Sequence, residues 1–289
     1  MTTATLEPPV ATGMRPGIHP GVSFVDYFAI DAINNSKLTL FSQKTPAHAR
    51  WEITHPDEDT DSLRVGSATH AAILEPDRFA REYVKPPEVN RRTNAGKQEW
   101  ADWLLSHPKQ NYLLPAEWDM ACALRDAVWS HKLAPDLLKG AGQNEMTAIW
   151  NDVPTGLLCK GRVDRFTQWQ GWSVVVDVKT AKDASPKEFA KACVDYMYHQ
   201  AAAFYLDGLA TIAPHDRRFI HLVIEKAPPY CVAVYELDEP AIREGRAQYM
   251  KALATYSECL KRNEWPGYAV GVEALDIPSW AYQLTAPEK

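Results

Sequence analysis

Residues 173–180 have the sequence Ser-Val-Val-Val-Asp-Val-Lys-Thr, and this stretch decides the fold of the chain. Its run of valines is typical of a buried strand, yet the run leads directly into Asp177 and Lys179. Because side chains alternate along a strand, these two charged residues face the same way, while Val178 faces the other side. Burying a carboxylate and an ammonium together is costly unless a divalent metal or a charged substrate compensates. We therefore expect a functional site at the end of this strand.

A second apolar stretch, residues 155–163, precedes this strand and is followed by Asp164 in the sequence Gly-Arg-Val-Asp. If residues 168–171 make the turn, the two strands pair antiparallel and bring Asp164 beside Asp177. Two acids and one lysine on neighbouring strand ends suit metal-assisted hydrolysis of a phosphodiester. The alternative is that Asp-x-Lys stands by chance on a solvent-facing edge strand, and the pair of strands alone does not decide between the two.

The composition bounds the class of protein. The chain has 289 residues, of which 46% are hydrophobic and 24% charged, as in ordinary soluble globular domains. No run of about 18 apolar residues occurs, so we expect no membrane span. Residues 1–20 contain four prolines and no apolar signal core, which favours a flexible lead-in and a cytoplasmic protein.

Cysteine usage and charge limit the candidate sites further. The five cysteines are scattered without a Cys-x-x-Cys motif, which argues against a zinc ribbon or an iron–sulfur cluster. The net charge of −6 does not favour nucleic acid, although a local basic track could still hold DNA.

Helical patterns come first along the chain, and mixed elements follow from residue 145. The predicted helices cover residues 34–44, 46–51, 62–74, 95–106, 115–132, 186–209 (interrupted near 195 and 196) and 240–262. The predicted strands cover residues 146–150, 157–166, 173–179, 218–225 and 231–236. We expect a single α/β domain over residues 21–289 with an N-terminal helical layer. The small residues Gly66, Ser67 and Ala68 should let their helix approach the sheet closely.

Four motifs then combine in a definite order. The first is a Ser-x-Leu…Pro-Ala-His pattern at residues 36–48, and the second is Gly-x-x-x-His…Leu-Glu-Pro over residues 66–76. The third joins residues 161–164 to residues 177–180, and the fourth is a Tyr…Gln…Tyr pattern within residues 196–208. Together they resemble the RecE-like exonucleases (exodeoxyribonuclease VIII type), which are phage and prophage members of the PD-(D/E)XK nuclease superfamily.

The resemblance implies a fold and an activity. It implies a PD-(D/E)XK core, that is, a central mixed sheet flanked by helices. It also implies a Mg²⁺-dependent exonuclease, with Mn²⁺ able to substitute, that degrades linear double-stranded DNA from 5′ ends and leaves 3′ single-stranded tails for recombination. A ring-shaped homo-oligomer and a RecT-like single-strand annealing protein as partner are implied by the family and not by any residue pattern.

Residue types and the resemblance together give candidate metal ligands. Asp164 and Asp177 supply the hard oxygen ligands that Mg²⁺ prefers, and the Val178 carbonyl could complete the inner shell. The resemblance makes His70 a further ligand, whereas without it His70 is better interpreted as a hydrogen-bonded core histidine.

Two further candidates concern catalysis. Lys179 would orient and help deprotonate the attacking water or neutralise the scissile phosphate, or else serve as an ion-pair partner of Asp177. The superfamily often has an acid in its first core helix, so Glu145 could hold a second metal or a metal-bound water. Glu145 could equally be a surface glutamate at a helix–strand junction.

The DNA contacts are predicted less directly. The densest basic segment suits phosphate contacts, although a charge run is more often a solvated face. Gln200 and Tyr205 stand five residues apart where the family has four, so they contact the scissile region or are plain helix-face residues. The candidate DNA-binding residues are Arg81, Arg91, Arg92, Lys97, Thr180, Gln200 and Tyr205.

Two other functions remain open at this level. The chain could be a related nuclease of other polarity, or a non-catalytic DNA-binding or recombination accessory module on the same fold. Retention of His70, Asp164, Asp177 and Lys179 together argues against a degenerate site. Metal-linked stabilisation would separate an enzyme from a module, because a degenerate site should not bind Mg²⁺ or Mn²⁺.

Overall fold

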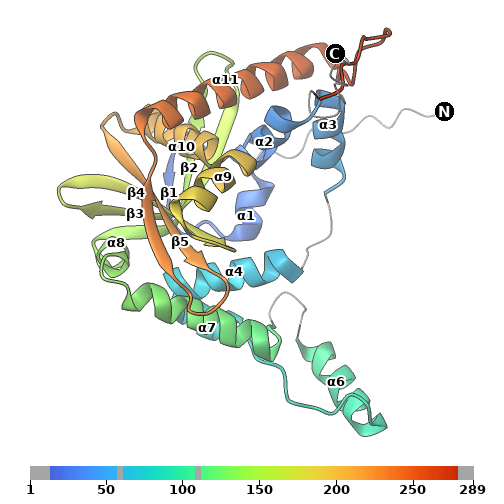
Figure 1. Cartoon of the computed structure of the whole chain (residues 1–289), viewed down its shortest axis with the longest axis vertical. Coiled ribbons are helices and arrows are strands. Elements are labelled where there is room, and N and C mark those ends of the chain that lie inside the picture. Colours follow the sequence, from blue (N-terminus) through green and yellow to red (C-terminus); the bar gives the residue numbers. More distant parts are fainter. Residues whose placement is uncertain (1–13, 57–60, 108–111, 279–289) are drawn as a thin grey trace, which may run out of the picture.

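The computed structural model describes residues 14–56, 61–107 and 112–278, and its centre is a six-stranded mixed sheet (Figure 1). The strands are β1 (Gly17–His19), β2 (Gly142–Asn151), β3 (Leu158–Trp169), β4 (Trp172–Ala181), β5 (Arg217–Glu225) and β6 (Val232–Glu236). They lie in sequence order across the sheet, and every neighbouring pair is antiparallel except β4 and β5, which are parallel. The expected α/β class and mixed central sheet are confirmed.

Helices cover both faces of this sheet (Figure 1). They are α1 (Phe24–Ala29), α2 (Asn35–Gln43), α3 (Pro46–Thr54), α4 (Asp61–Leu74), α5 (Pro76–Glu82), α6 (Asn94–Ser106), α7 (Pro115–Ser130), α8 (Ala134–Lys139), α9 (Pro186–Asp195), α10 (Tyr198–Ile212) and α11 (Glu239–Arg262). One apolar cluster joins α2, α3, α10 and α11 to one face of the sheet, and a second joins α4, α7 and α8 to the other face. The N-terminal helices are thus divided between the two faces. Within the described residues, no helix combines the length and apolar character needed to cross a membrane.

The two strands that carry the acids form the predicted hairpin. Gln170 and Gly171 both have positive φ, at 49° and 81°, and Trp169 pairs with Trp172, so the turn is shorter than the expected 168–171. The pairing of β3 with β4 runs from this turn only as far as Arg165 and Val176. Beyond that point β3 stays paired with β2, and β4 stays paired with β5. The sheet therefore forks immediately before Asp164 and Asp177.

Most of the longer predicted elements are present with shifts of a few residues at their ends. The interruption predicted near residues 195 and 196 is the break between α9 and α10, where Met197 has a φ of 56°. The elements without a prediction are β1, α1, α5 and α8, which span three to seven residues and are too short to show a periodic pattern. Residues 1–13 of the expected lead-in lie outside the described residues, and residues 17–19 of it form β1.

Gly66 behaves differently from the expectation of a close helix–sheet approach. A Cβ atom built on Gly66 meets no heavy atom within 4 Å, so this position faces open space, whereas Ala68 is fully buried. Gly245 of α11 is the opposite case, because a Cβ atom there would stand 2.2 Å from the His199 carbonyl oxygen of α10. The close helix contact is therefore between α10 and α11.

The same substitution at these two glycines should change stability in opposite directions. We expect Gly66→Ala to raise the free energy of unfolding by about 0.5–1 kcal/mol, because alanine reduces the backbone entropy of the unfolded chain. We expect Gly245→Ala to lower it by about 1–3 kcal/mol, because α10 and α11 must separate. Urea denaturation of the two variants checks this, and a Gly245→Ala protein as stable as wild type would contradict the helix contact.

Candidate metal centre

Three side chains from three elements meet at the fork of the sheet. His70 of α4, Glu145 of β2 and Asp164 of β3 each offer one ligand atom, and these atoms all lie within 4.8 Å of one another. His70 Nδ1 is 3.6 Å from Asp164 Oδ2, and all three side chains are half-buried. Two carboxylates and one imidazole at this spacing suit a divalent cation.

Glu145 enters this cluster through an unusual backbone conformation. Its φ is 51°, a left-handed value that costs a non-glycine residue about 1–2 kcal/mol. It stands opposite Asp164 at a gap in the pairing of β2 with β3, between the pairs Asn144–Arg165 and Met146–Val163. Glu145 therefore lies within β2 and not at a helix–strand junction. Strain of this kind often marks a functional position.

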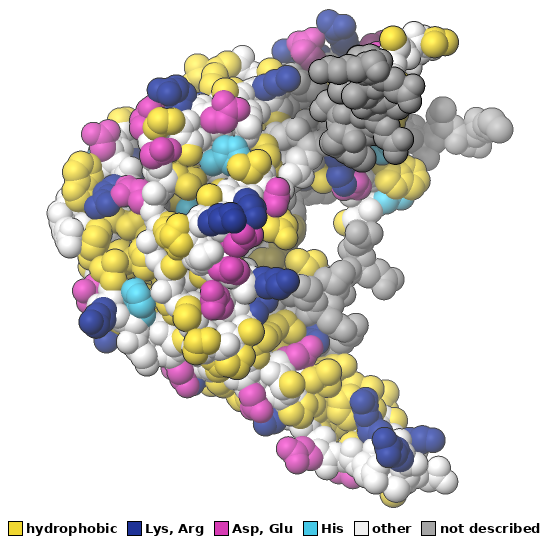
Figure 2. All heavy atoms as spheres, viewed as in Figure 1, with side chains coloured by type: hydrophobic (Ala, Val, Ile, Leu, Met, Phe, Trp, Pro, Cys, Tyr) yellow, Lys and Arg dark blue, Asp and Glu magenta, His cyan; other side chains and the backbone are white. Residues whose placement is uncertain are grey.

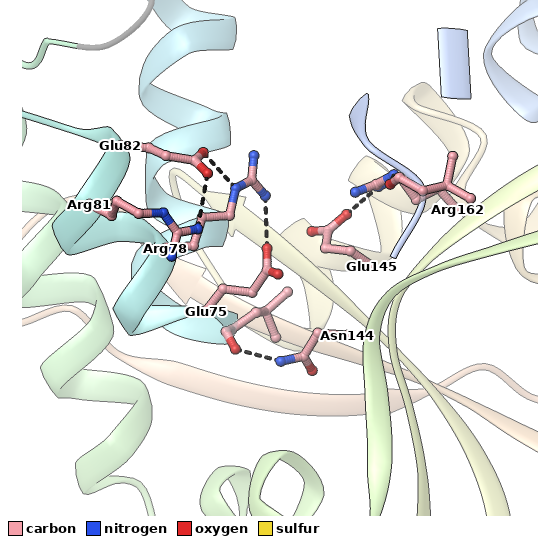
Figure 3. A network of polar contacts seen from close by, with 9 residues as sticks. Glu75, Arg78, Arg81, Glu82, Asn144, Glu145 and Arg162 are labelled. Atoms are coloured by element: carbon pink, nitrogen blue, oxygen red, sulfur yellow. Dashed lines mark hydrogen bonds and ion pairs between the residues drawn. The ribbon is translucent and has the colours of Figure 1, made fainter. Parts of the chain in front are cut away.

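Hydrogen bonds hold this part of β2 from two sides (Figure 3). Arg162 Nε donates to Glu145 Oε2 at 2.6 Å, and the two side chains point toward one another in the close-up view. On the other side, Asn144 Nδ2 donates to the carbonyl oxygen of Leu74, the last residue of α4, at 2.5 Å. This bond fixes the helix that carries His70 relative to the strand that carries Glu145.

Of the three cluster residues, Asp164 has the surroundings that most disfavour its ionised form. Its Oδ2 accepts a hydrogen bond from the backbone N–H of Val178 at 2.7 Å. Burial raises the pKa of Asp164 to about 6; the charge of His70 opposes this shift, and Asp177 adds to it. A bound cation would relieve this unfavourable charge, so the donor set fits a divalent metal. Val178 thus contributes its N–H to the site, and its carbonyl as a ligand stays a prediction.

Asp177 lies beside the cluster and is held by two other groups. Lys179 Nζ is 2.7 Å from its carboxylate, and His221 Nδ1 is 3.1 Å from Oδ2. Burial alone would raise the pKa of Asp177, but the Lys179 charge and the hydrogen bonds from His221 and Lys179 outweigh it and hold the pKa well below its usual range. Asp177 is therefore ionised, and its carboxylate is hydrogen-bonded to both Lys179 and His221.

Lys179 has the properties of a fixed positive charge. Burial would lower its pKa, but the charges of Asp177 and Asp164 raise the pKa above its usual range. Its ammonium also lies 5.1 Å from the centre of the Tyr198 ring. Lys179 is therefore a protonated ammonium paired with Asp177.

His221 is a residue of this site that the sequence analysis missed. It is 0% exposed, and it stands directly beside Asp177 in the parallel pairing of β4 with β5. Its Nε2 has no hydrogen-bond partner within the described part of the chain, so its polar contact is the one with Asp177. In the sequence, His221 is only a lone histidine in an apolar strand. It lies 44 residues after Asp177, and only the pairing of β4 with β5 brings the two side by side.

The helix after the core strands makes contacts of another kind. Gln200 is fully buried, and its amide bonds to Ser42, Asn35 and Thr39 of α2. Tyr205 packs its ring against Gly161 of β3, and burial raises its pKa well above the usual value. Gln200 therefore links two helices, whereas Tyr205 lies close enough to the acidic cluster for its pKa to be raised by those charges.

The predicted DNA-binding residues fall in different places. Strand alternation puts Thr180 on the face opposite Asp177 and Lys179. Arg81 is an exposed residue of α5, paired with Glu82 (Figure 3). The other three, Arg91, Arg92 and Lys97, are exposed at or before the start of α6. Helix α6 projects from the body of the protein, and Figure 2 shows basic side chains gathered at that projecting end.

Comparison with known proteins agrees with this architecture. Residues 35–278 match the model of a family described as a PDDEXK-like domain of unknown function (DUF3799). The chain belongs to this PDDEXK-like family. The crystal structure of a candidate exonuclease from Eubacterium rectale superposes with a TM-score of 0.52 at 11% identity, covering 83% of this chain and 91% of that one. The structure of SSO0001 is 15% identical and covers 76% of each chain, but its TM-score of 0.35 is too low to bear on the fold. No curated protein matches the chain.

The PDDEXK-like fold accounts for the position of the cluster. The mixed sheet flanked by helices is the core that the sequence predicted, and the resemblance to the superfamily is confirmed at that level. PD-(D/E)XK nucleases use divalent metals, and the acids and the lysine of the motif meet at the fork.

Two isosteric substitutions should shift the stability of the metal-free PDDEXK-like domain in opposite directions. Burial raises the pKa of Asp164 from 3.8 to about 6, so the ionised group destabilises the fold above pH 6 and not below pH 3.8. We expect Asp164→Asn to raise the free energy of unfolding at pH 8 by on the order of 1–3 kcal/mol, with the gain shrinking toward pH 5. Asp177→Asn should lower it, because Lys179 and His221 lose their anionic partner. Urea denaturation in EDTA measures both, and equal signs for the two variants would contradict this electrostatic assignment.

His221 should matter through the orientation of Asp177. The sequence predicts Asp177 as a metal ligand, and on that prediction we expect His221→Leu to weaken the affinity for Mn²⁺ by about 10- to 100-fold, since partners that orient a ligating carboxylate have effects of this size. In His221→Asn the side-chain amide can occupy the place of Nδ1 and keep the affinity within a few-fold of wild type. The measurement is the Mn²⁺ dependence of the melting temperature. Equal Mn²⁺ affinity in the Leu and Asn variants would show that His221 only fills space.

Proposed function

We propose that this chain is a divalent-metal-dependent nuclease that hydrolyses phosphodiester bonds of DNA. The observation that carries the proposal is the meeting of two groups at the fork. One is the donor cluster of His70, Glu145 and Asp164, and the other is the buried pair of Asp177 and Lys179. A half-buried acidic cluster with a protonated lysine beside it suits a substrate that is a polyanion.

The residues have distinct roles in this proposal. His70, Glu145 and Asp164 would hold Mg²⁺, with Mn²⁺ as a substitute, and Asp177 would join them when its carboxylate turns from Lys179. When bound, such an ion lowers the pKa of a coordinated water and stabilises charge on the phosphate. The Lys179 ammonium neutralises the scissile phosphate, and His221 keeps its contact with Asp177 Oδ2 as the carboxylate turns. Arg162 holds the strained Glu145 toward the centre.

The finer proposal is an exonuclease of RecE-like type. It would act on linear double-stranded DNA from 5′ ends, in the cytoplasm, and leave 3′ tails for recombination. Support comes from the ordered motifs of the sequence and from the neighbouring structure, which is that of a candidate exonuclease. A ring-shaped homo-oligomer and a RecT-like annealing partner belong to the same proposal. The exposed basic residues at and before the start of α6 would contact phosphates of the duplex.

The first test uses linear duplex DNA labelled at either the 5′ or the 3′ end, incubated with Mg²⁺, with Mn²⁺ or with EDTA. We expect short 5′-labelled products in the presence of metal and none in EDTA. Asp177→Ala should abolish cleavage, because it leaves Lys179 without its partner and removes a ligand. The matched control is Asp126→Ala, which removes an exposed carboxylate of α7 and should cleave as wild type does.

Each other outcome redirects the proposal. Equal loss of covalently closed circles would indicate an endonuclease, and release of 3′-labelled products would reverse the polarity. If well-folded wild-type protein cleaves with neither metal and its melting temperature does not respond to them, the nuclease proposal fails. The chain would then be a non-catalytic DNA-binding or recombination accessory module.

A further inference from the structure

Helix α1 presents an aromatic face to solvent. Phe24 and Phe28 are 51% and 59% exposed, and their ring centres lie 4.6 Å apart in an edge-to-face arrangement. Between them Tyr27 turns inward, is 5% exposed and anchors the helix on the sheet. Single exposed apolar residues are common, but here two neighbouring phenylalanines expose their rings together on one side of a six-residue helix.

This helix is fastened to the strand that carries Asp164. The buried ammonium of Lys160 donates to the carbonyl oxygens of Tyr27 and Ile30 at 2.6 and 2.7 Å, at the C-terminal end of α1. Arg162, two residues further along β3, donates from Nη1 to the Val22 carbonyl oxygen at 2.8 Å, before the helix begins. Two basic side chains of β3 thus fix both ends of α1, so the aromatic face is a rigid surface.

The aromatic face lies next to the metal centre. The Cζ atom of Arg162 is 5.8 Å from the centre of the Phe24 ring, and Nε of the same guanidinium is 2.6 Å from Glu145 Oε2. Adding the single bond between Nε and Cζ places the Phe24 ring within about 10 Å of that carboxylate. This span corresponds to roughly three steps of a stacked strand at about 3.4 Å per step. A nucleotide that follows or precedes a scissile phosphate at the centre can therefore reach the ring.

We propose that Phe24 and Phe28 form a stacking platform for an unpaired base of the strand that enters the metal centre. The inference rests on the proposed function and extends it to the substrate, because the bases behind the end of a fully paired duplex are stacked on both faces and none is free to stack singly on α1. The preferred substrate is a DNA end with an unpaired terminal segment. Arg162 lies against the Phe24 ring on the side of the centre, where it can also meet the phosphate of the stacked nucleotide. Helix α1 lies before residue 35, so the platform is outside the residues matched by the family model.

The test measures binding apart from cleavage. Full-length protein in EDTA is titrated into duplex DNA with a single-stranded extension that carries 2-aminopurine, whose fluorescence falls when the base stacks. We expect the double variant Phe24→Ala/Phe28→Ala to abolish the quenching and to weaken binding of the extension by roughly ten- to one-hundred-fold. Phe24→Tyr should keep the quenching, whereas Phe24→Leu, which keeps an apolar side chain without a π face, should lose it. Val25→Ala is the control, since Val25 is 77% exposed on the same helix and should bind as wild type does.

The outcomes separate this inference from the nuclease proposal. If wild type quenches the probe but cleaves no DNA with either metal, the platform stands and the nuclease proposal fails. If wild type cleaves and the double alanine variant quenches and binds like wild type, the platform is overturned. A double variant that loses several degrees of melting temperature or changes its sedimentation coefficient would also overturn it, because the face would then be covered by protein. Melting and sedimentation of all variants therefore accompany the titration.

Discussion

The hydrogen bond from the Val178 N–H to Asp164 Oδ2 is the interaction on which the site depends. Pairing of β3 with β4 ends at Arg165 and Val176, so the N–H groups of β4 beyond that point have no backbone acceptor on β3. A buried N–H without a partner is costly, and here a side-chain carboxylate takes the place of the missing strand. The bond spans the fork of the sheet, and the fork is where His70 and Glu145 approach Asp164.

The same fork creates an electrostatic conflict that the fold does not resolve by itself. Asp177 is stabilised as an anion by Lys179 and His221, whereas burial of Asp164 raises its pKa to about 6. The protein thus keeps one carboxylate well partnered and leaves the other in need of a cation. The backbone of Glu145, held at a φ of 51° by its place in β2 and by Arg162, adds a second unfavourable term. A metal bound between these groups would give the buried Asp164 carboxylate and the strained Glu145 backbone a function. Neither feature stabilises the fold by itself.

The sequence predicted the parts of this site that depend on local pattern. A valine run that ends in Asp-x-Lys, together with a preceding apolar stretch and a second acid, was enough to predict the hairpin of β3 and β4, whose pairing ends immediately before Asp164 and Asp177. It could not predict His221, because its neighbour in the sheet is 44 residues away and only the parallel register joins them. It left Glu145 open between a metal-holding acid and a surface residue at a helix–strand junction, because a left-handed residue inside a strand leaves no signal in residue type. Short elements such as β1 and α1 are held in place by hydrogen bonds to β2 and β3. Their own residues show no periodic pattern of hydrophobic residues from which they could be predicted.

Those short elements change what should be regarded as the domain. The family match begins at residue 35, yet β1 completes the edge of the sheet beside β2 and α1 is bonded through Arg162 to the carboxylate of Glu145. Strand β3 also depends on α1 through Lys160. The ammonium of Lys160 is buried, and its hydrogen-bond acceptors are carbonyl oxygens at the C-terminal end of α1. Without that segment, a buried charge on β3 would lose its carbonyl partners next to the metal centre, and desolvation would then disfavour the strand itself. The segment before the matched region is therefore a structural part of the centre.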